Sequence, residues 1–285
     1  MYLMEDYWFE ELRVNYQIHF GTVSEVNGYF PTGWWALILL HSGTVKLADG
    51  ERIIKLSAGQ LFSLPPSAKF KAIIGTVKMS IVCYTAELAY SSLLLKSSRS
   101  YLDHIFSASP ITVSIGRWEV VRMSQHFRFL ADSMATRKIS LFGKELFLLH
   151  YNLLLFSFSV VASDQSRIDN SGRNRKEILF LKFLHLLRSN CRKEHSVKFY
   201  ADTLCITTGY LGRAIREMGG RSAKHFIEMA IVSEAYMLLG DQGLTIAEIA
   251  EELAFSGTST FSTFFKKAAM VSPRAYRESI LQNKI

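Results

Sequence analysis

Residues 245–267 read TIAEIAEELAFSGTSTFSTFFKK, and this stretch says most about the fold of the last third of the chain. It begins with four apolar residues at positions i, i+3, i+4 and i+7, a spacing that predicts one buried face of a short helix. A break follows at residues 254–257, and a second short helix is predicted after it. The apolar residues of the first helix are Ile246, Ile249, Ala250 and Leu253.

The same pattern occurs a second time upstream. Val197, Tyr200, Ala201 and Leu204 repeat the apolar spacing, a break follows at residues 205–207, and a second short helix begins after it. The spacing between the first and second helix is one residue longer in the downstream copy than in the upstream copy. This predicts an extra residue in the turn of the downstream copy. Two short helices at a fixed angle form a helix–turn–helix unit, whose second helix can enter a DNA major groove.

Length and charge agree with a separate DNA-binding part. A chain of 285 residues is long enough for two domains, and its net charge is +8. Residues 175–285 carry 16 Lys and Arg against 11 Asp and Glu, a balance that favours a phosphate-rich partner. The polar stretch 162–174 predicts a linker between a sensor and dimerisation domain at 1–161 and a DNA-binding domain at 175–285.

The first part of the chain predicts strands followed by helices. Short apolar runs separated by turn signals favour a sandwich or barrel, and Asp49-Gly50 predicts a tight hairpin. Long helices are predicted at 118–137 and 139–161. The second is apolar on most sides, so it needs cover either from its own domain or from a partner subunit. Its stretch 146–161 is short for a membrane span, and we interpret it as a buried helix, with a membrane span as the alternative. The predicted strands are 36–40, 44–47, 52–56, 60–64, 69–74 and 77–84.

The cysteines and the N-terminus predict a reducing, cytoplasmic location. Cys83, Cys191 and Cys205 show no metal-binding spacing, and an odd number does not indicate a disulfide framework. Residues 1–6 lack the charged start and apolar run of a signal peptide.

Residues 178–279 resemble the AraC family of bacterial transcription regulators. Residues 245–267, followed by SPRAYR at 272–277, are similar to the family signature of an IxxIA helix, a turn, an SxFSxxFK recognition helix and a closing SPxxYR. The resemblance implies two helix–turn–helix units joined by a long helix and bound to successive major-groove turns on one DNA face. It also implies double-stranded DNA and RNA polymerase as partners. We expect a homodimer through residues 118–161 and no membrane association.

The chain departs from the family pattern at several positions, which bears on base specificity. Mapped onto the motif, Arg213 is the candidate for a bidentate contact with guanine, whereas Arg216 and Arg221 are better placed for phosphates. The departures are Ile231, Ala254, Gly257, Thr260, Thr263 and Met270. The complete set of predicted DNA-binding residues is Thr208, Gly209, Tyr210, Gly212, Arg213, Arg216, Arg221, Thr258, Ser259, Ser262, Thr263, Lys266 and Lys267.

Residues 58–66, AGQLFSLPP, resemble the turn of a cupin barrel, which many members of this family carry. Metal-binding cupins need several histidines and a glutamate, but His41 stands alone, so we expect no metal, no cofactor and no enzyme activity. The barrel is predicted to hold a small-molecule effector, although an ordinary core explains the same aromatic residues. The candidate effector-binding residues are Tyr29, Trp34, Trp35 and Phe62.

The predicted fold is therefore α+β: an N-terminal cupin-like β-barrel with a helical pair, then an all-α DNA-binding domain with two helix–turn–helix units. A rival function is an enzyme fused to a DNA-binding module. That enzyme would be a cupin catalyst, or a DNA-repair methyltransferase with a reactive cysteine, for which Cys83 lies in an unfavourable apolar run. A third function is an interaction protein that has lost DNA binding, since Gly209 and Gly212 leave the first recognition helix sparse.

Overall fold

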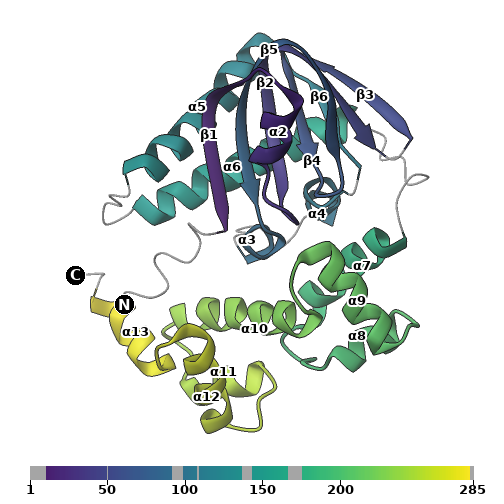
Figure 1. The fold of residues 1–285 in the computed structure, drawn as a ribbon. Coiled ribbons are helices and arrows are strands. Elements are labelled where there is room, and N and C mark those ends of the chain that lie inside the picture. Colours follow the sequence, from purple (N-terminus) through teal and green to yellow (C-terminus); the bar gives the residue numbers. More distant parts are fainter. Residues whose placement is uncertain are drawn as a thin grey trace. The chain divides into compact units, whose positions relative to one another are not determined.

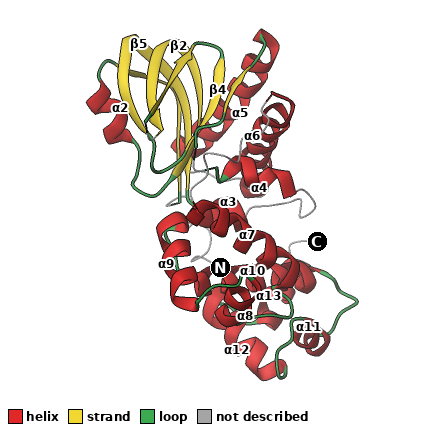
Figure 2. Cartoon of the chain, turned by 90° about the vertical axis from the view of Figure 1, so that its right-hand side faces the viewer, coloured by secondary structure: helices red, strands yellow, loops and turns green. Residues whose placement is uncertain are grey.

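The computed structural model of the chain describes residues 11–49, 51–91, 99–107, 109–136, 143–165 and 175–282. The chain divides into two compact units, with the boundary between Ile178 and Leu179. The first unit contains a β-sheet with helices, and the described part of the second contains helices only (Figures 1 and 2). The predicted α+β class is confirmed.

The sheet of the first unit is antiparallel. The order of its strands is β1-β5-β2-β4-β6, and β3 pairs with β2 outside this path. Strands β2 and β3 form the predicted hairpin, which closes at the pair Asp49 and Arg52. The described strands are β1 (Leu12–Phe20), β2 (Trp35–Asp49), β3 (Arg52–Ser57), β4 (Gln60–Leu64), β5 (Lys69–Tyr84) and β6 (Thr112–Ser114).

Several predicted strand boundaries were wrong, because bulges were interpreted as turns. Runs 36–40 and 44–47 belong to the single strand β2, and runs 69–74 and 77–84 both belong to β5. The β2–β5 register shifts around Ser42 instead of ending there. Gly43 has φ +83°, and a Cβ at this position would lie 2.6 Å from Val77 Cγ1. The glycine thus permits a bulge and a close approach between the two strands.

Two elements near the N-terminus were not predicted. Strand β1 contains a bulge between Asn15 and Ile18, and Gln17 within it has φ 54°, so apolar and polar residues do not alternate regularly. Helix α2 (Val23–Tyr29) is the second of these elements. Thr22 and Glu25 form a capping box that starts this helix.

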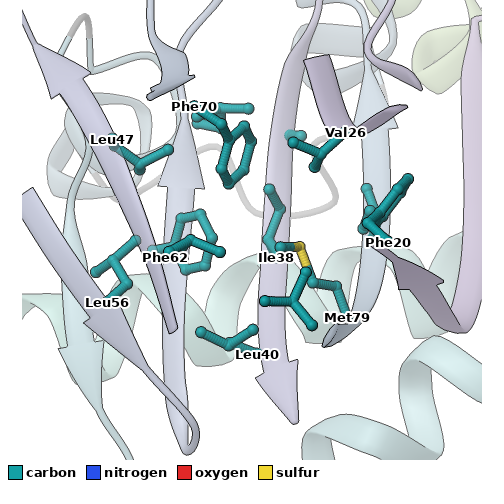
Figure 3. Packing of buried hydrophobic residues seen from close by; sticks show 14 of the residues in the cluster. Phe20, Val26, Ile38, Leu40, Leu47, Leu56, Phe62, Phe70 and Met79 are labelled. Carbon is teal, nitrogen blue, oxygen red and sulfur yellow. The ribbon is translucent and has the colours of Figure 1, made fainter. Parts of the chain in front are cut away.

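The sheet packs apolar residues on both faces of β2. Ala36, Ile38 and Leu40 point into one cluster with Phe62 and Phe70, shown in Figure 3. The intervening residues point to the other face, where the Trp35 ring meets Phe106 edge-on at 5.3 Å. These residues are fully or almost fully buried, as the apolar run of β2 requires.

Four further helices follow α2 in the described part of the first unit. Helix α5 packs against β1, and α6 packs against α5 (Figure 1). By length and composition, α6 is the one candidate membrane span among the described residues, and 44% of its apolar window is buried. A core helix of a globular protein passes the same test. The helices after α2 are α3 (Ala86–Ser91), α4 (Arg99–Ile105), α5 (Arg117–Thr136) and α6 (Gly143–Gln165).

The boundaries of the predicted linker differ from the structure at one end. Helix α6 continues to Gln165, so residues 162–165 are helical, and residues 166–174 lie outside the described residues. Helix α7 begins at Arg175, the residue at which the DNA-binding domain was predicted to begin. The division into domains at 1–161 and 175–285 stays a prediction.

The second unit is organised around its longest helix, α10. Helices α8 and α9 contact one part of α10, and α11, α12 and α13 contact another (Figure 1). Ala235, Leu238 and Leu239 of α10 form one core with Ile249, Phe261 and their neighbours. The helices are α7 (Arg175–Asn190), α8 (Val197–Thr203), α9 (Thr208–Gly219), α10 (Ala223–Gly240), α11 (Ile246–Glu252), α12 (Thr258–Ala269) and α13 (Pro273–Gln282).

Candidate nucleic-acid interface

Helices α8 and α9 form the first short helix pair. Ser196 caps α8 by accepting a hydrogen bond from the amide of Phe199, and Thr207 caps α9 by accepting one from Tyr210. The chain reverses between them at Cys205, which has φ 55°. The amide of Ile206 donates to the carbonyl of Ala201 at 3.0 Å. These bonds fix the angle at which α9 leaves α8.

Helices α11 and α12 form the second pair with the same backbone pattern. Thr245 and Glu248 form a capping box, and Ala254 has φ 53° at the position equivalent to Cys205. The amide of Phe255 donates to the carbonyl of Ala250 at 2.9 Å, as Ile206 does in the first pair. Helix α11 starts 49 residues after α8, whereas α12 starts 50 residues after α9. The structure therefore has the one extra residue predicted for the second turn.

Helix α9 has one buried and one exposed side. Leu211, Ala214 and Ile215 are fully buried, whereas Arg213 and Arg216 are exposed. Gly209 is exposed and Gly212 is partly exposed, and a Cβ on either would meet no heavy atom within 4 Å. Packing within the described structure therefore does not require these two glycines. The exposed side of α9 combines basic side chains with positions that carry no side chain.

Helix α12 presents hydroxyl groups and lysines. Phe261 and Phe265 face the core, and Thr258, Ser259, Thr263, Lys266 and Lys267 are exposed. Thr263 donates its hydroxyl proton to the carbonyl of Ser259 at 2.9 Å, and its side chain is exposed. Such a surface suits contacts with phosphates and with thymine methyl groups.

The remaining predicted DNA-binding residues differ in their exposure. Thr208 is exposed, Tyr210 and Ser262 are partly exposed, and Arg221 is exposed just after the left-handed Gly220 that ends α9. The structure thus places each predicted residue on or beside α9 or α12. Their contacts with DNA stay predictions.

Two of the residues that depart from the family pattern lie at a buried position and at a helix end. Ile231 is 2% exposed in the apolar side of α10, and Met270 adopts φ 58° at the end of α12. The closing SPxxYR motif ties α13 to the unit, because Tyr276 packs against Tyr236 with ring centroids 4.7 Å apart. The Nε of Arg277 donates to the carbonyl of Leu239 at 3.3 Å.

The candidate effector residues do not line one cavity wall. Tyr29 and Trp34 are partly buried against the cluster that contains Phe62, but Trp35 lies on the opposite face of β2. Tyr29 donates its hydroxyl proton to Asn15 at 2.6 Å, and burial raises its pKa. Phe62 and Trp35 are fully buried, which agrees with an ordinary core role for these two.

In the first unit, Cys83 is buried, and His41, His126 and His150 each make a side-chain contact. Burial raises the pKa of Cys83 to about 12, which disfavours the reactive thiolate. His41 shares a 2.7 Å hydrogen bond with Ser80, and the Nδ1 atoms of His126 and His150 lie 3.0 Å apart. Among the described residues, no group of three or more His, Cys, Asp or Glu side chains is placed to hold a metal ion.

Sequence reasoning missed one ionic cluster in the second unit. Arg192, between α7 and α8, bonds to Glu234 of α10 and Glu252 of α11. These residues are separated by 42 and 60 positions, so no local pattern predicts their meeting.

Comparison with known proteins identifies the class of the second unit. A family model described as a helix-turn-helix domain matches residues 200–279. The HTH-type transcriptional activator RhaS from Mannheimia succiniciproducens is 26% identical over 121 residues, which are 42% of this chain and 45% of that protein. The chain thus matches less than half the length of this curated relative.

Two solved structures are also similar. The C-terminal domain of AraT, a response regulator from Geobacillus stearothermophilus, is 29% identical and covers 37% of this chain and 88% of its own, with a TM-score of 0.35. Unsaturated fatty acid-bound ToxT from Vibrio cholerae is 15% identical and covers 94% of this chain and 95% of its own, with a TM-score of 0.36.

The helix pairs and the family match define the second unit as a helix–turn–helix DNA-binding domain. Residues 200–279 belong to the AraC type of this domain.

Proposed function

We propose that this protein is a sequence-specific transcription regulator that places α9 and α12 in successive major-groove turns on one face of DNA. The observation that carries the proposal is the repeated helix pair, in which equivalent turn hydrogen bonds support two exposed polar helices. Exposed cations on both helices supply the electrostatic attraction for phosphates. RNA polymerase as a partner follows from the family resemblance and belongs to the same proposal.

Arg213 is proposed to read a base, and Lys266 to contact a phosphate. We expect Arg213→Ala to lose about 1–3 kcal/mol of discrimination at one base pair. Lys266→Ala should weaken binding to all sequences and lower the salt dependence by about one phosphate contact. Selection from random duplexes, followed by titrations at several salt concentrations, measures both effects.

The matched control for these variants is Lys224→Ala, which removes an exposed cation of α10 that pairs with Glu228. It should leave base preference unchanged. An unchanged base preference for Arg213→Ala would remove this residue from the reading role. If the intact chain bound no duplex at low salt, the protein would instead fit the alternative of an interaction module without DNA binding.

The first unit is proposed to form a homodimer through residues 118–161. The support is a line of exposed apolar side chains on α6, of which Leu149 and Leu153 are 46% and 49% exposed. Burying such a line against a second copy would remove it from water. Leu149→Glu with Leu153→Glu should convert the dimer to a monomer in sedimentation experiments, whereas Ser163→Glu at the end of α6 should not. A monomeric unaltered chain would contradict this part.

A small-molecule effector at the first unit is also part of the proposal. Tyr29 and Trp34 are the candidate contacts, because Trp35 and Phe62 are fully buried. The fluorescence of Trp34 should report binding when a library of apolar and aromatic acids is screened, with Trp34→Phe as the control. A cupin-like metal enzyme is the alternative, and metal analysis of the purified protein tests it.

A further inference from the structure

The loop between α7 and α8 contacts the second helix pair across the unit. Arg192, in this loop, donates from Nε to Glu234 Oε2 at 2.8 Å and from Nη1 to Glu252 Oε1 at 2.6 Å. Glu234 belongs to α10, and Glu252 is the last residue of α11. One guanidinium group therefore connects the entrance of the first helix pair, the central helix and the second pair.

The two arms of this cluster differ in burial. The Glu234 side chain is 8% exposed, whereas those of Arg192 and Glu252 are 37% and 40% exposed. Burying a carboxylate is costly unless it is paired, and the Arg192–Glu234 arm supplies such a pairing. The Glu252 carboxylate has access to water, and therefore its bond to Arg192 is not needed to compensate for burial.

The electrostatics support a fixed arrangement. Burial alone would lower the pKa of Arg192, but the hydrogen bond and charge of Glu234 and the charge of Glu252 raise it above its usual value. A guanidinium group is planar and presents its donors in fixed directions. One arm bonds to buried Glu234, and the other bonds to Glu252 at the end of α11.

A second contact comes from the same loop. The His195 ring lies 5.0 Å from the ring of Phe255, which is in the turn between α11 and α12. Phe255 in turn packs against Phe261 and Phe264 of α12, at 5.5 Å and 5.1 Å. The loop thus contacts the second pair at the end of α11 and at the turn that leads to the recognition helix.

We propose that Arg192, acting through Glu252, is a positioning residue that fixes the angle between α9 and α12. Without this bridge, the two pairs are joined through the His195–Phe255 contact and through the contacts that each makes with α10, and a small bend of α10 would change their relative angle. The bridge makes the protein selective for one spacing of its two DNA elements. This inference rests on the proposed DNA-binding function for its biological meaning, but its structural part does not.

The structural part is tested without DNA. Spin labels are attached to the exposed Cys205, beside α9, and to a cysteine introduced by Ala268→Cys on α12. Cys83 and Cys191 are buried and resist labelling. Pulsed electron paramagnetic resonance should give a narrow distribution of distances between the two spin labels in the otherwise unaltered chain. Glu252→Ala, which keeps the buried Arg192–Glu234 pair, should broaden or shift it.

The control is Arg274→Ala, which breaks an exposed ion pair confined to α13 and should leave the distribution unchanged. Arg192→Ala should broaden the distribution further and also destabilise the unit, so Glu252→Ala carries the conclusion if Arg192→Ala does not fold. An unchanged distribution in Glu252→Ala would overturn the positioning role.

The functional part compares binding to two duplexes. The first is selected from random DNA by the unaltered chain, and the second has one base pair inserted between the two DNA segments that the protein contacts. Glu252→Ala should reduce the preference for the uninserted duplex by about two- to fivefold, the range expected for one exposed ion pair. Equal preference in the variant and the unaltered chain would overturn the proposal. If the unaltered chain selects no duplex, the DNA-binding function fails, and the spin-label distances still decide the bridge.

Discussion

The two helix pairs of the second unit share one backbone plan but differ in the surfaces they expose. The turns place Cys205 and Ala254 in the same left-handed conformation, with equivalent hydrogen bonds around them. Arginines and glycines mark the exposed side of α9, whereas hydroxyls and lysines mark that of α12. The buried apolar sides of the helices therefore stabilise the same backbone arrangement in both pairs. The exposed sides carry different residues and can differ in what they recognise.

The largest effect should come from the buried aromatic side chain of the second pair. Phe261→Ala removes a fully buried ring of the core shared by α10, α11 and α12, and we expect a loss of about 3–5 kcal/mol of unfolding free energy. Leu211→Ala should cost about 2–5 kcal/mol in the first pair. Urea unfolding measures both losses, and hydrogen exchange locates them. A loss below about 1 kcal/mol for Phe261→Ala would contradict the assigned core.

The turn residues allow a direct comparison of the pairs. A left-handed conformation costs a non-glycine residue roughly 1–2 kcal/mol, and glycine avoids this cost but adds freedom to the unfolded chain. Ala254→Gly and Cys205→Gly should therefore each raise the unfolding free energy, by about 0.5–1 kcal/mol. Thermal unfolding checks the gain. If Ala254→Gly destabilised the protein, the left-handed turn in the second pair would be incorrect.

The glycines of α9 distinguish stability from recognition. Gly212→Ala should raise the stability of the free protein by about 0.5–1 kcal/mol, because a helical glycine gives way to alanine and no atom lies within 4 Å of the new Cβ. It should also weaken DNA binding if the backbone of α9 closely approaches the duplex. Gly240→Ala, at the end of α10, is the control for binding. Tighter binding by Gly212→Ala would argue against a close approach.

The smallest effect concerns the N-terminal caps of α8 and α11. The cap of α11 contains a titratable carboxylate, that of Glu248, whereas the equivalent position in α8 is Phe199. The hydrogen bonds to Thr245 lower the pKa of Glu248, so this residue stabilises the fold above its unfolded pKa, and the contribution is lost as pH falls through the folded value. Glu248→Gln keeps an acceptor but does not titrate. Its stability difference from the unaltered chain should vanish in acid. A difference that persisted at pH 3 would contradict the capping role.

The helical unit could be predicted closely because its information is local. Apolar spacing and capping residues such as Ser196 and Thr245 lie within a few positions of the helices they define. The sheet was harder, since the bulges at Gly43 and Gln17 depend on strands far apart in the sequence. The local pattern divided β2 into two predicted strands on either side of Gly43, and it did not predict β1.

The candidate site also has parts that local sequence predicts and parts that it does not. The exposed positions of α9 and α12 follow from the helical period, but the bridge from Arg192 to Glu234 and Glu252 depends on residues from three elements. The contact between His126 and His150 likewise joins two helices, through residues that are 24 positions apart. Such contacts need three-dimensional packing, which spacing alone does not encode.

The central claim is that α9 and α12 dock side by side on one duplex. Hydroxyl-radical footprinting of the full chain on its selected duplex tests it most directly. We expect two protected patches on one face of the DNA, one helical turn or about 10 base pairs apart. A single patch, or two patches on opposite faces, would contradict the account.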